Sequence, residues 1–301
     1  MDLAMVGLGR MGANMAERLV RGGHRVVGHD PGEEALTRAA GKGIEPAASL
    51  AAAVEALPTP RIVWLMIPAG ALVDTLLDEL QPLLSADDIV IDGGNSLYKD
   101  TVARAERLRE HDLHYVDVGT SGGVWGLAEG YSMMVGGETA VVDSLAPLFE
   151  TLAPAAGKGW GHVGPSGAGH FSKMIHNGIE YGMMQSYAEG FAILQKKTEF
   201  DLDLHQVAEI WRHGSVVRSW LLDLTANALD KNPALAGIAP YVSDSGEGRW
   251  TVAEAVELDV SAPVITLSLL ERLRSRESDA FGDKLLAAMR NEFGGHAIKS
   301  D

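Results

Sequence analysis

Hydrophobic residues follow two different patterns along the 301-residue chain. In the first half, short apolar and β-branched runs alternate with stretches that have helical periodicity. The runs expected to form strands span residues 3–8, 25–30, 61–67, 88–94, 114–120 and 131–137. Such alternation predicts an α/β domain in which helices cover both faces of a mainly parallel sheet.

Beyond about residue 165 the strand-like runs stop. The stretches that are compatible with helices there span residues 166–197, 203–230, 250–276 and 278–293. Glycine and proline cluster between the two halves, in GKGWGHVGPSGAG, and such clusters are typical of a boundary. We therefore expect two domains: residues 1–164, which contain the sheet, and an all-α domain of residues 165–301.

Composition narrows the classes of function. With 46% hydrophobic and 22% charged residues, the chain has the composition of a compact soluble protein. Its net charge of -16 disfavours binding to nucleic acid or to an anionic membrane. The longest apolar run, from Ile62, is too short to span a bilayer, and the N-terminus does not resemble a signal peptide. We expect a cytoplasmic protein without nucleic-acid or membrane partners.

A glycine-rich turn follows the first predicted strand. Gly7, Gly9 and Gly12 form G-x-G-x-x-G between that strand and a helix, which is the context of a dinucleotide-binding loop. The glycines allow a tight turn, close approach of the backbone to a pyrophosphate, and close packing of the helix on the strand. The motif predicts that the first domain is of the Rossmann type. The residues expected to bind the cofactor are Gly7, Leu8, Gly9, Arg10, Met11, Gly12, Asp30, Met66 and Asn95.

Asp30 ends the second predicted strand, 18 residues after Gly12. An acid at this place can accept hydrogen bonds from the adenosine ribose hydroxyls, and it repels a 2′-phosphate. Pro31 and Gly32 provide no arginine to bind such a phosphate, so we expect NAD, with NADP disfavoured. The alternative is that Asp30 caps the following helix.

The segment KMIHNGIEYG, residues 173–182, carries five functional groups on a predicted helix. At about 100° per residue, Lys173, Asn177 and Glu180 share one face, and His176 and Tyr181 flank it. A solvated face is the alternative, but the neighbouring residues are apolar and predict a helix that is buried on nearly all sides. Because burial of a lysine and a glutamate is costly, the arrangement favours a cavity lined by catalytic groups.

Five motifs carry a resemblance to a known family. In chain order they are DGGNS (92–96), GTSGGVWGLAEG (119–130), KMIHNGIEYG (173–182), GEGRWT (246–251) and RNEFGGH (290–296). Over essentially the whole chain they resemble decarboxylating 6-phosphogluconate dehydrogenase, in the superfamily of β-hydroxyacid dehydrogenases. The length is similar to the short, NAD-type form. The resemblance implies conversion of 6-phospho-D-gluconate to D-ribulose 5-phosphate and carbon dioxide, in the pentose phosphate pathway and gluconate utilisation.

For catalysis, the resemblance implies that Lys173 is the general base at the carbon-3 hydroxyl and afterwards an acid. A lysine can be a base near pH 7 only if burial or its neighbours lower its pKa. Glu180 matches the glutamate that protonates the enediol, and Asn177 and His176 match residues that position hydroxyls. No metal is implied, and the sequence agrees, because the chain has no cysteine and its ten histidines lack a metal-ligand spacing.

For the substrate, the resemblance implies two anion-binding regions. Ser121, Gly122 and Gly123 resemble a turn whose backbone N–H groups bind the carboxylate, although a plain turn between strands is the alternative. Asn95 matches an asparagine near substrate and nicotinamide, but a turn-forming asparagine would look the same. The positions that match phosphate-binding residues are Tyr181, Arg272, Arg290 and His296.

The C-terminal motif also bears on assembly. Arg290 and His296 lie in a motif that reaches into the neighbouring subunit in the long form of the enzyme, so the resemblance implies a homodimer or homotetramer. For Arg272, the alternative is an ordinary solvated arginine.

One loop departs from the family pattern. Ser245 and Glu247 stand where the long form has lysine and threonine, which weakens the case for a phosphate there. Arg249 can compensate through its bidentate fork, or it can pair with Glu247. The alternatives are a dehydrogenase of an unphosphorylated aldonate such as gluconate, a β-hydroxyacid dehydrogenase that does not decarboxylate, and a non-enzymatic nucleotide sensor.

Overall fold

The computed structural model describes residues 1–294 and 297–299. The chain divides into two compact units, Met1–Asn177 and Gly178–Asp301, and each unit has a buried core of its own. Within the described residues, no helix is both long enough and apolar enough to cross a membrane.

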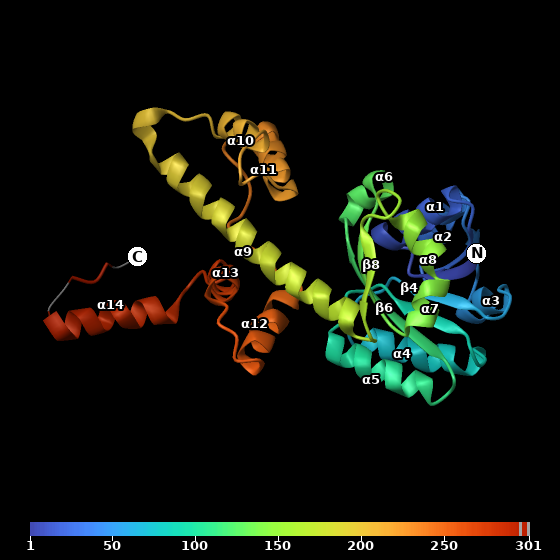
Figure 1. Cartoon of the computed structure of the whole chain (residues 1–301). Helices are drawn as coiled ribbons and strands as arrows, with labels where there is room; N and C mark the ends of the chain where they lie inside the picture. The colour runs from blue at the N-terminus through green and yellow to red at the C-terminus, as the bar shows by residue number, and fades with distance from the viewer. Residues whose placement is uncertain (295–296, 300–301) are drawn as a thin grey trace. The chain divides into compact units, whose positions relative to one another are not determined.

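The first unit is built on one eight-stranded sheet (Figure 1). Its strands are β1 (Asp2–Val6), β2 (Arg25–His29), β3 (Glu45–Pro46), β4 (Ile62–Leu65), β5 (Ile89–Asp92), β6 (His114–Ser121), β7 (Ser132–Gly136) and β8 (Trp160–Gly164). The spatial order is β3-β2-β1-β4-β5-β6-β7-β8, and every neighbouring pair is parallel except β6 with β7. The predicted mainly parallel sheet is confirmed. The sequence pattern does not predict β3, which has two residues, or β8, whose glycines are typical of a turn.

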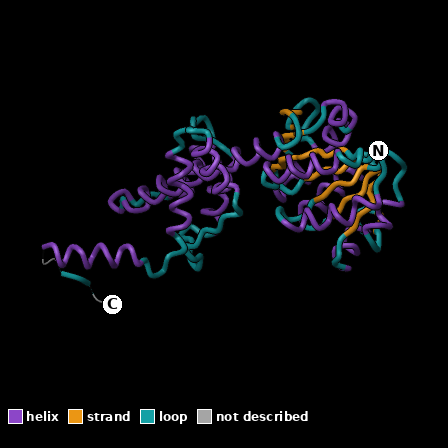
Figure 2. The backbone as a smooth tube through the Cα atoms, turned by 90° about the horizontal axis from the view of Figure 1, so that it is seen from below, coloured by secondary structure: helices purple, strands orange, loops and turns teal. Residues whose placement is uncertain are grey.

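Helices cover both faces of this sheet. They are α1 (Arg10–Arg21), α2 (Glu33–Ala40), α3 (Leu50–Glu55), α4 (Ala71–Leu80), η1 (Gln81–Leu83), α5 (Tyr98–Arg109), η2 (Gly123–Trp125), α6 (Gly126–Glu129), α7 (Thr139–Ser144) and α8 (Ala146–Leu152). Met5 of β1 packs in one hydrophobic cluster, whereas its neighbours Ala4 and Val6 pack in another. Because side chains alternate along a strand, the two clusters lie on opposite faces of the sheet. Figure 2 shows the strands, in orange, between the helices, in purple.

The carboxyl ends of the central parallel strands meet at one edge. Val6 of β1 pairs with Leu65 of β4, and Leu65 pairs with Asp92 of β5. Asp92 lies beside Asp117 of β6, and β6 continues to Ser121 at the same edge. The loops that follow these strands therefore converge there, at the edge where open parallel sheets bind ligands.

The second unit is helical, as the sequence predicts. The 29-residue helix α9 (Ala168–Lys196) begins in the first unit and ends in the second. The helices that follow are η3 (Thr198–Phe200), α10 (Leu204–Arg212), α11 (Trp220–Lys231), α12 (Glu247–Glu257), α13 (Pro263–Arg274) and α14 (Phe281–Gly294).

Two of the predicted helices are each broken into two. Residues 213–219 separate α10 from α11, and Gly214 there has a φ of 78°. Residues 258–262 separate α12 from α13, which begins at Pro263. Apolar periodicity continues across both breaks, but the left-handed Gly214 lies in the first break and Pro263 begins the helix after the second.

The core of the second unit is small. Phe191 of α9 packs with one residue of α10 and three of α11, namely Ala208, Leu222, Ala226 and Leu229. Ile179, Met183 and Met184 of α9 are 52%, 39% and 40% exposed. The prediction that this helix is buried on nearly all sides is therefore wrong for the single chain, because these apolar residues near its middle lie at the surface.

Candidate active site

The glycine-rich turn joins β1 to α1. Gly7 has a φ of 92°, and a β-carbon there would lie 2.4 Å from the carbonyl oxygen of Met66. A β-carbon at Gly12 would lie 2.0 Å from the carbonyl oxygen of Gly7, whereas one at Gly9 would meet no atom within 4 Å. Gly9 is also the N-cap of α1 and has no side chain to cap it. The turn therefore offers open space beside helix N–H groups, which fits a pyrophosphate.

Asp30 lies beside this turn, directly after β2. One carboxylate oxygen accepts a hydrogen bond from the N–H of Leu8 at 2.8 Å, and the other accepts one from the N–H of Gly32 at 2.9 Å. Gly32 is the N-cap of α2, so Asp30 does not cap that helix. Leu8 is 2% exposed, and only its backbone can face a ligand. Asp30 thus joins the glycine turn to the start of α2.

Met66 connects the glycine turn with the loop after β5. A β-carbon at Gly12 would lie 3.0 Å from the β-carbon of Met66, and a β-carbon at Gly93 would lie 2.6 Å from its sulfur. Met66 is half-buried, as is Met11, whereas Arg10 is exposed. The structure therefore brings the predicted cofactor residues of four loops, after β1, β2, β4 and β5, to one edge of the sheet.

Asn95 and the predicted carboxylate-binding turn also lie together. Asn95 has a left-handed φ of 53°; its Nδ2 donates to the carbonyl oxygen of Thr120 at 3.3 Å, and its Oδ1 accepts from the N–H of Thr120 at 3.0 Å. Ser121 ends β6, and Gly122 and Gly123 follow it with φ values of 136° and 52°. The side chain of Asn95 therefore holds the strand end from which this turn starts.

Lys173, His176 and Asn177 form a hydrogen-bonded cluster in the first half of α9. The Nζ atom of Lys173 donates to Oδ1 of Asn177 at 2.5 Å and lies 3.2 Å from Nδ1 of His176. Lys173 is 5% exposed. Burial disfavours a charged ammonium, and a nearby oxygen can accept its proton in a hydrogen bond. The cluster therefore contains the groups that a proton-exchange site requires.

Asp117 of β6 fixes the start of α9, although the sequence analysis does not single it out. This fully buried carboxylate accepts hydrogen bonds from the N–H groups of Gly167 at 2.7 Å and His170 at 2.8 Å. A carboxylate at a helix N-terminus satisfies N–H groups that have no partner within the helix. The signal for it is an acid in the middle of the apolar strand run HYVDVGT.

Two predicted phosphate-binding residues meet in the second unit. Tyr181 is 6% exposed, and the guanidinium carbon of Arg272 lies 3.5 Å from the centroid of its ring. Arg272 also donates to the carbonyl oxygen of Ser243 at 3.0 Å. This cation–π contact orients the guanidinium, so Arg272 is not an ordinary solvated arginine. Glu180, the neighbour of Tyr181, is half-buried.

Arg249 pairs with Asp244 and not with Glu247. Its Nε atom donates to one oxygen of Asp244 at 3.0 Å, and Arg276 donates to the other oxygen at 2.5 Å. Glu247 instead accepts a hydrogen bond from the hydroxyl of Ser245. The hydrogen bond from Arg249, and secondarily that from Arg276, lowers the pKa of the Asp244 carboxyl from its ordinary value. One carboxylate is therefore shared by two arginines.

Asp244 and Arg276 are not among the residues predicted from the sequence. The available signal is weak: Arg276 lies four residues after Arg272, in the arginine-rich ERLRSRES segment. Arg290 is exposed on α14, and His296 lies outside the described residues.

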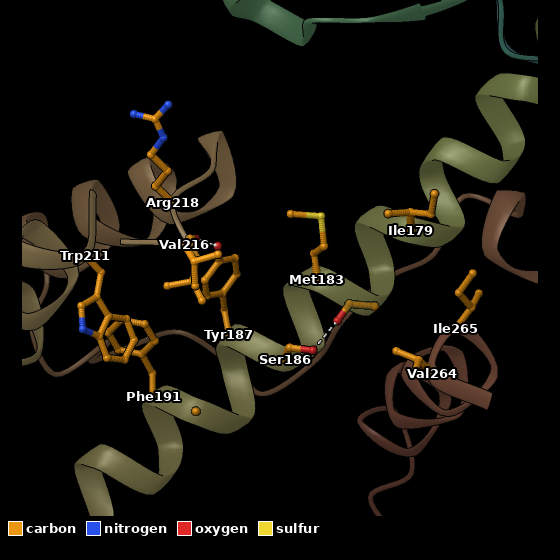
Figure 3. A pocket seen from close by; sticks show the side chains of 13 residues that line it. Ile179, Met183, Ser186, Tyr187, Phe191, Trp211, Val216, Arg218, Val264 and Ile265 are labelled. Carbon is orange, nitrogen blue, oxygen red and sulfur yellow. Dashed lines mark hydrogen bonds between the residues drawn. The ribbon is translucent and has the colours of Figure 1, made fainter. Parts of the chain in front are cut away.

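An apolar cavity of about 560 Å³ lies beside α9 in the second unit, as Figure 3 shows. Tyr187, Phe191 and Trp211 line it, together with Val216 from the loop before α11. Among the described residues that line it, Arg218 alone carries a charge. Without a carboxylate, a lysine or a histidine the cavity cannot perform the proposed acid–base chemistry, so the polar cluster around Lys173 is the better candidate.

Family models match most of the chain. Residues 2–163 match the NAD binding domain of 6-phosphogluconate dehydrogenase, and residues 169–281 match the C-terminal domain of 6-phosphogluconate dehydrogenase. The chain is 44% identical over 299 residues to an NAD(+)-dependent, decarboxylating 6-phosphogluconate dehydrogenase of Haloferax volcanii. The alignment covers 99% of this chain and 98% of that protein.

A second relative and a solved structure indicate the same family. The chain is 36% identical over 287 residues to an NADP(+)-dependent, decarboxylating 6-phosphogluconate dehydrogenase of Bacillus subtilis, over 91% of this chain and 61% of that protein. The solved 6-phosphogluconate dehydrogenase of Plasmodium falciparum matches with a TM-score of 0.84 and 28% identity, over 100% of this chain and 66% of that one. The resemblance drawn from five sequence motifs is thereby confirmed, and the chain belongs to the decarboxylating 6-phosphogluconate dehydrogenase family of oxidoreductases.

Proposed function

We propose that this protein oxidises 6-phospho-D-gluconate at carbon 3 and releases its carboxyl group as carbon dioxide, forming D-ribulose 5-phosphate with NAD as hydride acceptor. The observation that carries the proposal is the buried Lys173, which is hydrogen-bonded to Asn177 and adjacent to His176. A buried amine beside an oxygen acceptor can exchange a proton with a substrate hydroxyl. Membership of the decarboxylating family supports the same reaction.

Lys173 has two successive roles in this proposal. It first takes the proton of the carbon-3 hydroxyl, so that carbon 3 can release its hydrogen as a hydride, which a bound nicotinamide would accept. The bond between carbons 1 and 2 of the resulting β-keto acid then breaks, and its electron pair moves toward the carbon-3 oxygen. Protonated Lys173 stabilises the charge that develops there and gives its proton to that oxygen, which leaves an enediol.

Glu180 completes the reaction. It donates a proton to the carbon that lost carbon dioxide, while Lys173 takes the proton of the enediol hydroxyl as the ketone forms. Glu180 lies seven residues after Lys173 on α9, nearly two helical turns, so both groups share one helix face. This spacing supports a base and an acid that act on the same substrate.

The remaining predicted residues bind the substrate. We assign the carboxylate to the backbone N–H groups of Ser121, Gly122 and Gly123, and the hydroxyls to Asn177, His176 and Asn95. We assign the phosphate to cationic and phenolic side chains, which are Tyr181, Arg249, Arg272, Arg290 and His296. The contact between Arg272 and Tyr181 supports this part, because an oriented guanidinium can bind a phosphate with two parallel hydrogen bonds.

NAD is the proposed cofactor, bound by residues 1–164. The open space at Gly9 and the carboxylate of Asp30 support this choice, because Asp30 would repel the 2′-phosphate of NADP. A bound nicotinamide supplies the hydride acceptor. Family membership alone does not choose the cofactor, since one relative is NADP(+)-dependent and another NAD(+)-dependent.

We propose that residues 165–301 provide the oligomer contacts of a homodimer or homotetramer. Val216, Phe281 and Val256 of the second unit are 98%, 76% and 74% exposed, and large apolar side chains at the surface favour association. Light scattering should then give two or four times the chain mass of 32.0 kDa. A mass of one chain at micromolar concentration would contradict this.

The decisive experiment measures reduced cofactor and released carbon dioxide in the same reaction, for four pairings of substrate and cofactor: 6-phosphogluconate or gluconate with NAD or NADP. The proposal expects equal yields of both products, and the highest kcat/KM, with 6-phosphogluconate and NAD. NADH without carbon dioxide would contradict the role of Glu180, and preference for NADP would contradict that of Asp30.

Gluconate is the second candidate substrate, and one observation favours it. Arg249 and Arg276 share Asp244, so their positive charge is partly neutralised before any phosphate binds. A higher kcat/KM for gluconate than for 6-phosphogluconate would leave the proposed oxidative decarboxylation in place but would contradict the proposed phosphate-binding site.

A further inference from the structure

A buried carboxylate organises the loop that carries Asn95. Asp92 ends β5 and is 0% exposed. Its Oδ1 accepts from the N–H of Gly94 at 3.0 Å, and its Oδ2 accepts from the hydroxyls of Ser96 at 2.7 Å and Tyr115 at 2.8 Å. Burial, and then the negative charge of Asp92, raise the pKa of Tyr115, so this phenol remains a donor. The loop of residues 93–96 is therefore fastened on both sides of Asn95.

Arg104 joins this loop to the one that precedes α4. It lies on α5, is 3% exposed, and its Nη1 is 3.9 Å from Oδ2 of Asp92. Its Nε and Nη2 atoms donate to the two oxygens of Asp74 of α4, both at 2.8 Å, and Nη2 also donates to the carbonyl oxygen of Gly70 at 3.1 Å. The hydrogen bond from Arg104 is the main cause of the lowered pKa of Asp74. One guanidinium thus reaches two loops at the carboxyl edge of the sheet.

The chain of contacts continues to the third loop. Asn95 hydrogen-bonds both backbone groups of Thr120, directly before the turn of Ser121 to Gly123. Arg104 thus links Gly70 of the loop after β4 to Asp92, and Asp92 holds Gly94 and Ser96 of the loop after β5. Asn95 lies between these two residues and joins that loop to Thr120, at the end of β6. These loops carry Met66, Asn95 and the proposed carboxylate turn.

We propose that Asp92 and Arg104 are positioning residues of the dehydrogenation, which hold the three loops in the relative placement that hydride transfer requires. The inference rests on the proposed function of Asn95 and of the turn. Neither residue need touch the substrate. A misplacement of reacting groups by about 1 Å can lower a rate about 100-fold, so a buried polar network that holds the loops in place affects the rate. Replacing a buried ion pair by apolar side chains is often tolerated for stability, so stability alone does not demand this pair.

The same strand offers a matched control at its other end. Asp88, directly before β5, is also 0% exposed. It accepts from Nη1 of Arg61 at 3.0 Å and from the N–H groups of Arg61 at 2.6 Å and Ser85 at 2.9 Å. Asp88 and the half-buried Arg61 thus form a second ion pair, at the amino edge of the sheet, away from the three loops. Substitutions there report on stability without touching the proposed network.

The test compares Asp92→Asn and Arg104→Lys with Asp88→Asn and Arg61→Lys. Each variant is assayed at a temperature where circular dichroism shows it folded, and kcat is expressed per folded molecule. We expect Asp92→Asn to lower kcat by about tenfold to 100-fold, with the dissociation constant for NADH changed less than about threefold. Arg104→Lys keeps the positive charge but loses the forked guanidinium, so its kcat should lie between those of the wild type and Asp92→Asn. Asp88→Asn and Arg61→Lys should lower the melting temperature and leave kcat within about twofold.

A second readout does not depend on the substrate. Hydrogen exchange of the amides in residues 93–96 and 119–123 should become faster in Asp92→Asn and stay unchanged in Asp88→Asn. Equal losses of kcat in the two variants, or unchanged exchange of both loops in Asp92→Asn, would overturn the inference. If the wild type fails to turn over 6-phosphogluconate, the proposed function fails, but the exchange comparison still decides whether Asp92 holds the loops.

Discussion

Gly119 of β6 and Lys173 of α9 lie so close together that no side chain fits between them. A β-carbon at Gly119 would lie 2.4 Å from the β-carbon of Lys173 and 2.6 Å from the carbonyl oxygen of Gly169, closer than real β-carbons approach other atoms. The backbone of β6 therefore sets the position of the proposed base through direct contact.

Gly119→Ala should move Lys173 away from the sheet. We expect kcat to fall by about tenfold to 100-fold, because proton transfer depends on placement, while the affinity for NADH stays unchanged. Steady-state kinetics and a fluorescence titration with NADH measure the two effects. Gly161→Ala in β8 is the control, since a β-carbon there would meet no atom within 4 Å. A similar loss of kcat in both variants would contradict the special role of this contact.

Lys173→Met should abolish proton exchange and leave the cofactor site intact. We expect kcat to fall by about a thousandfold or more, with NADH bound as in the wild type. Lys173→Arg should not restore activity, because a guanidinium stays protonated and cannot act as a base. Lys196→Met, at the exposed end of the same helix, is the control and should keep full activity. Substantial turnover by Lys173→Arg would rule out the base role.

Asp30→Asn should weaken the preference for NAD. The substitution removes the charge that repels a 2′-phosphate and one good acceptor for the ribose, so the ratio of kcat/KM for NAD to that for NADP should fall about tenfold or more. Initial rates with both cofactors give the ratio. Glu33→Gln, at an exposed position in the first turn of α2, removes a nearby charge and should leave the ratio unchanged. If both variants shift it equally, general electrostatics and not Asp30 selects the cofactor.

Asp244→Asn should destabilise the protein in a pH-dependent manner. Arg249 and Arg276 lower the pKa of Asp244 from its ordinary value of 3.8, so the folded state binds this proton less readily than the unfolded state does. The resulting stabilisation is fully present well above pH 3.8 and is lost as the pH falls through the lower, folded-state pKa. In urea unfolding at pH 7, the free energy of unfolding should be about 1 kcal/mol lower in the variant than in the wild type. This difference should decrease as the solution becomes acidic.

The control for this prediction is Asp230→Asn, an exposed acid on α11. It should unfold like the wild type at every pH. If the difference in unfolding free energy between Asp244→Asn and the wild type stays constant down to pH 3, the charge of Asp244 is not the cause. The contribution of an ion pair must decrease as its carboxyl is protonated.

The parts of the site that the sequence predicts are local in the chain. Lys173, His176 and Asn177 contact one another because residues three and four apart share a helix face, which the sequence shows directly. The glycine turn and Asp30 are predictable for a similar reason, since strand, turn and helix follow one another in the chain. The mainly parallel sheet follows from the alternation of strands and helices in the first half.

The parts that the sequence does not predict depend on distant packing. Arg104 reaches Asp74, 30 residues away, only because α4 and α5 lie side by side (Figure 1). Arg276 and Asp244 are 32 residues apart, and they likewise meet only because two distant segments of the chain pack together. Hydrophobic periodicity indicates which face of a helix is buried, but it does not indicate which buried residue faces which. For the same reason periodicity does not show the breaks at 213–219 and 258–262, where a left-handed glycine follows α10 and a proline begins α13.

The placement of Lys173 and Glu180 on one helix constrains how this protein can change. An α-helix turns about 100° per residue, so a single inserted or deleted residue between the two would swing Glu180 out of phase with Lys173. A substitution in the same stretch leaves the phase intact, and a gain or loss of seven residues would nearly restore it. Insertions and deletions are therefore expected in the loops between helices, whereas this part of α9 must keep its length even where its composition varies.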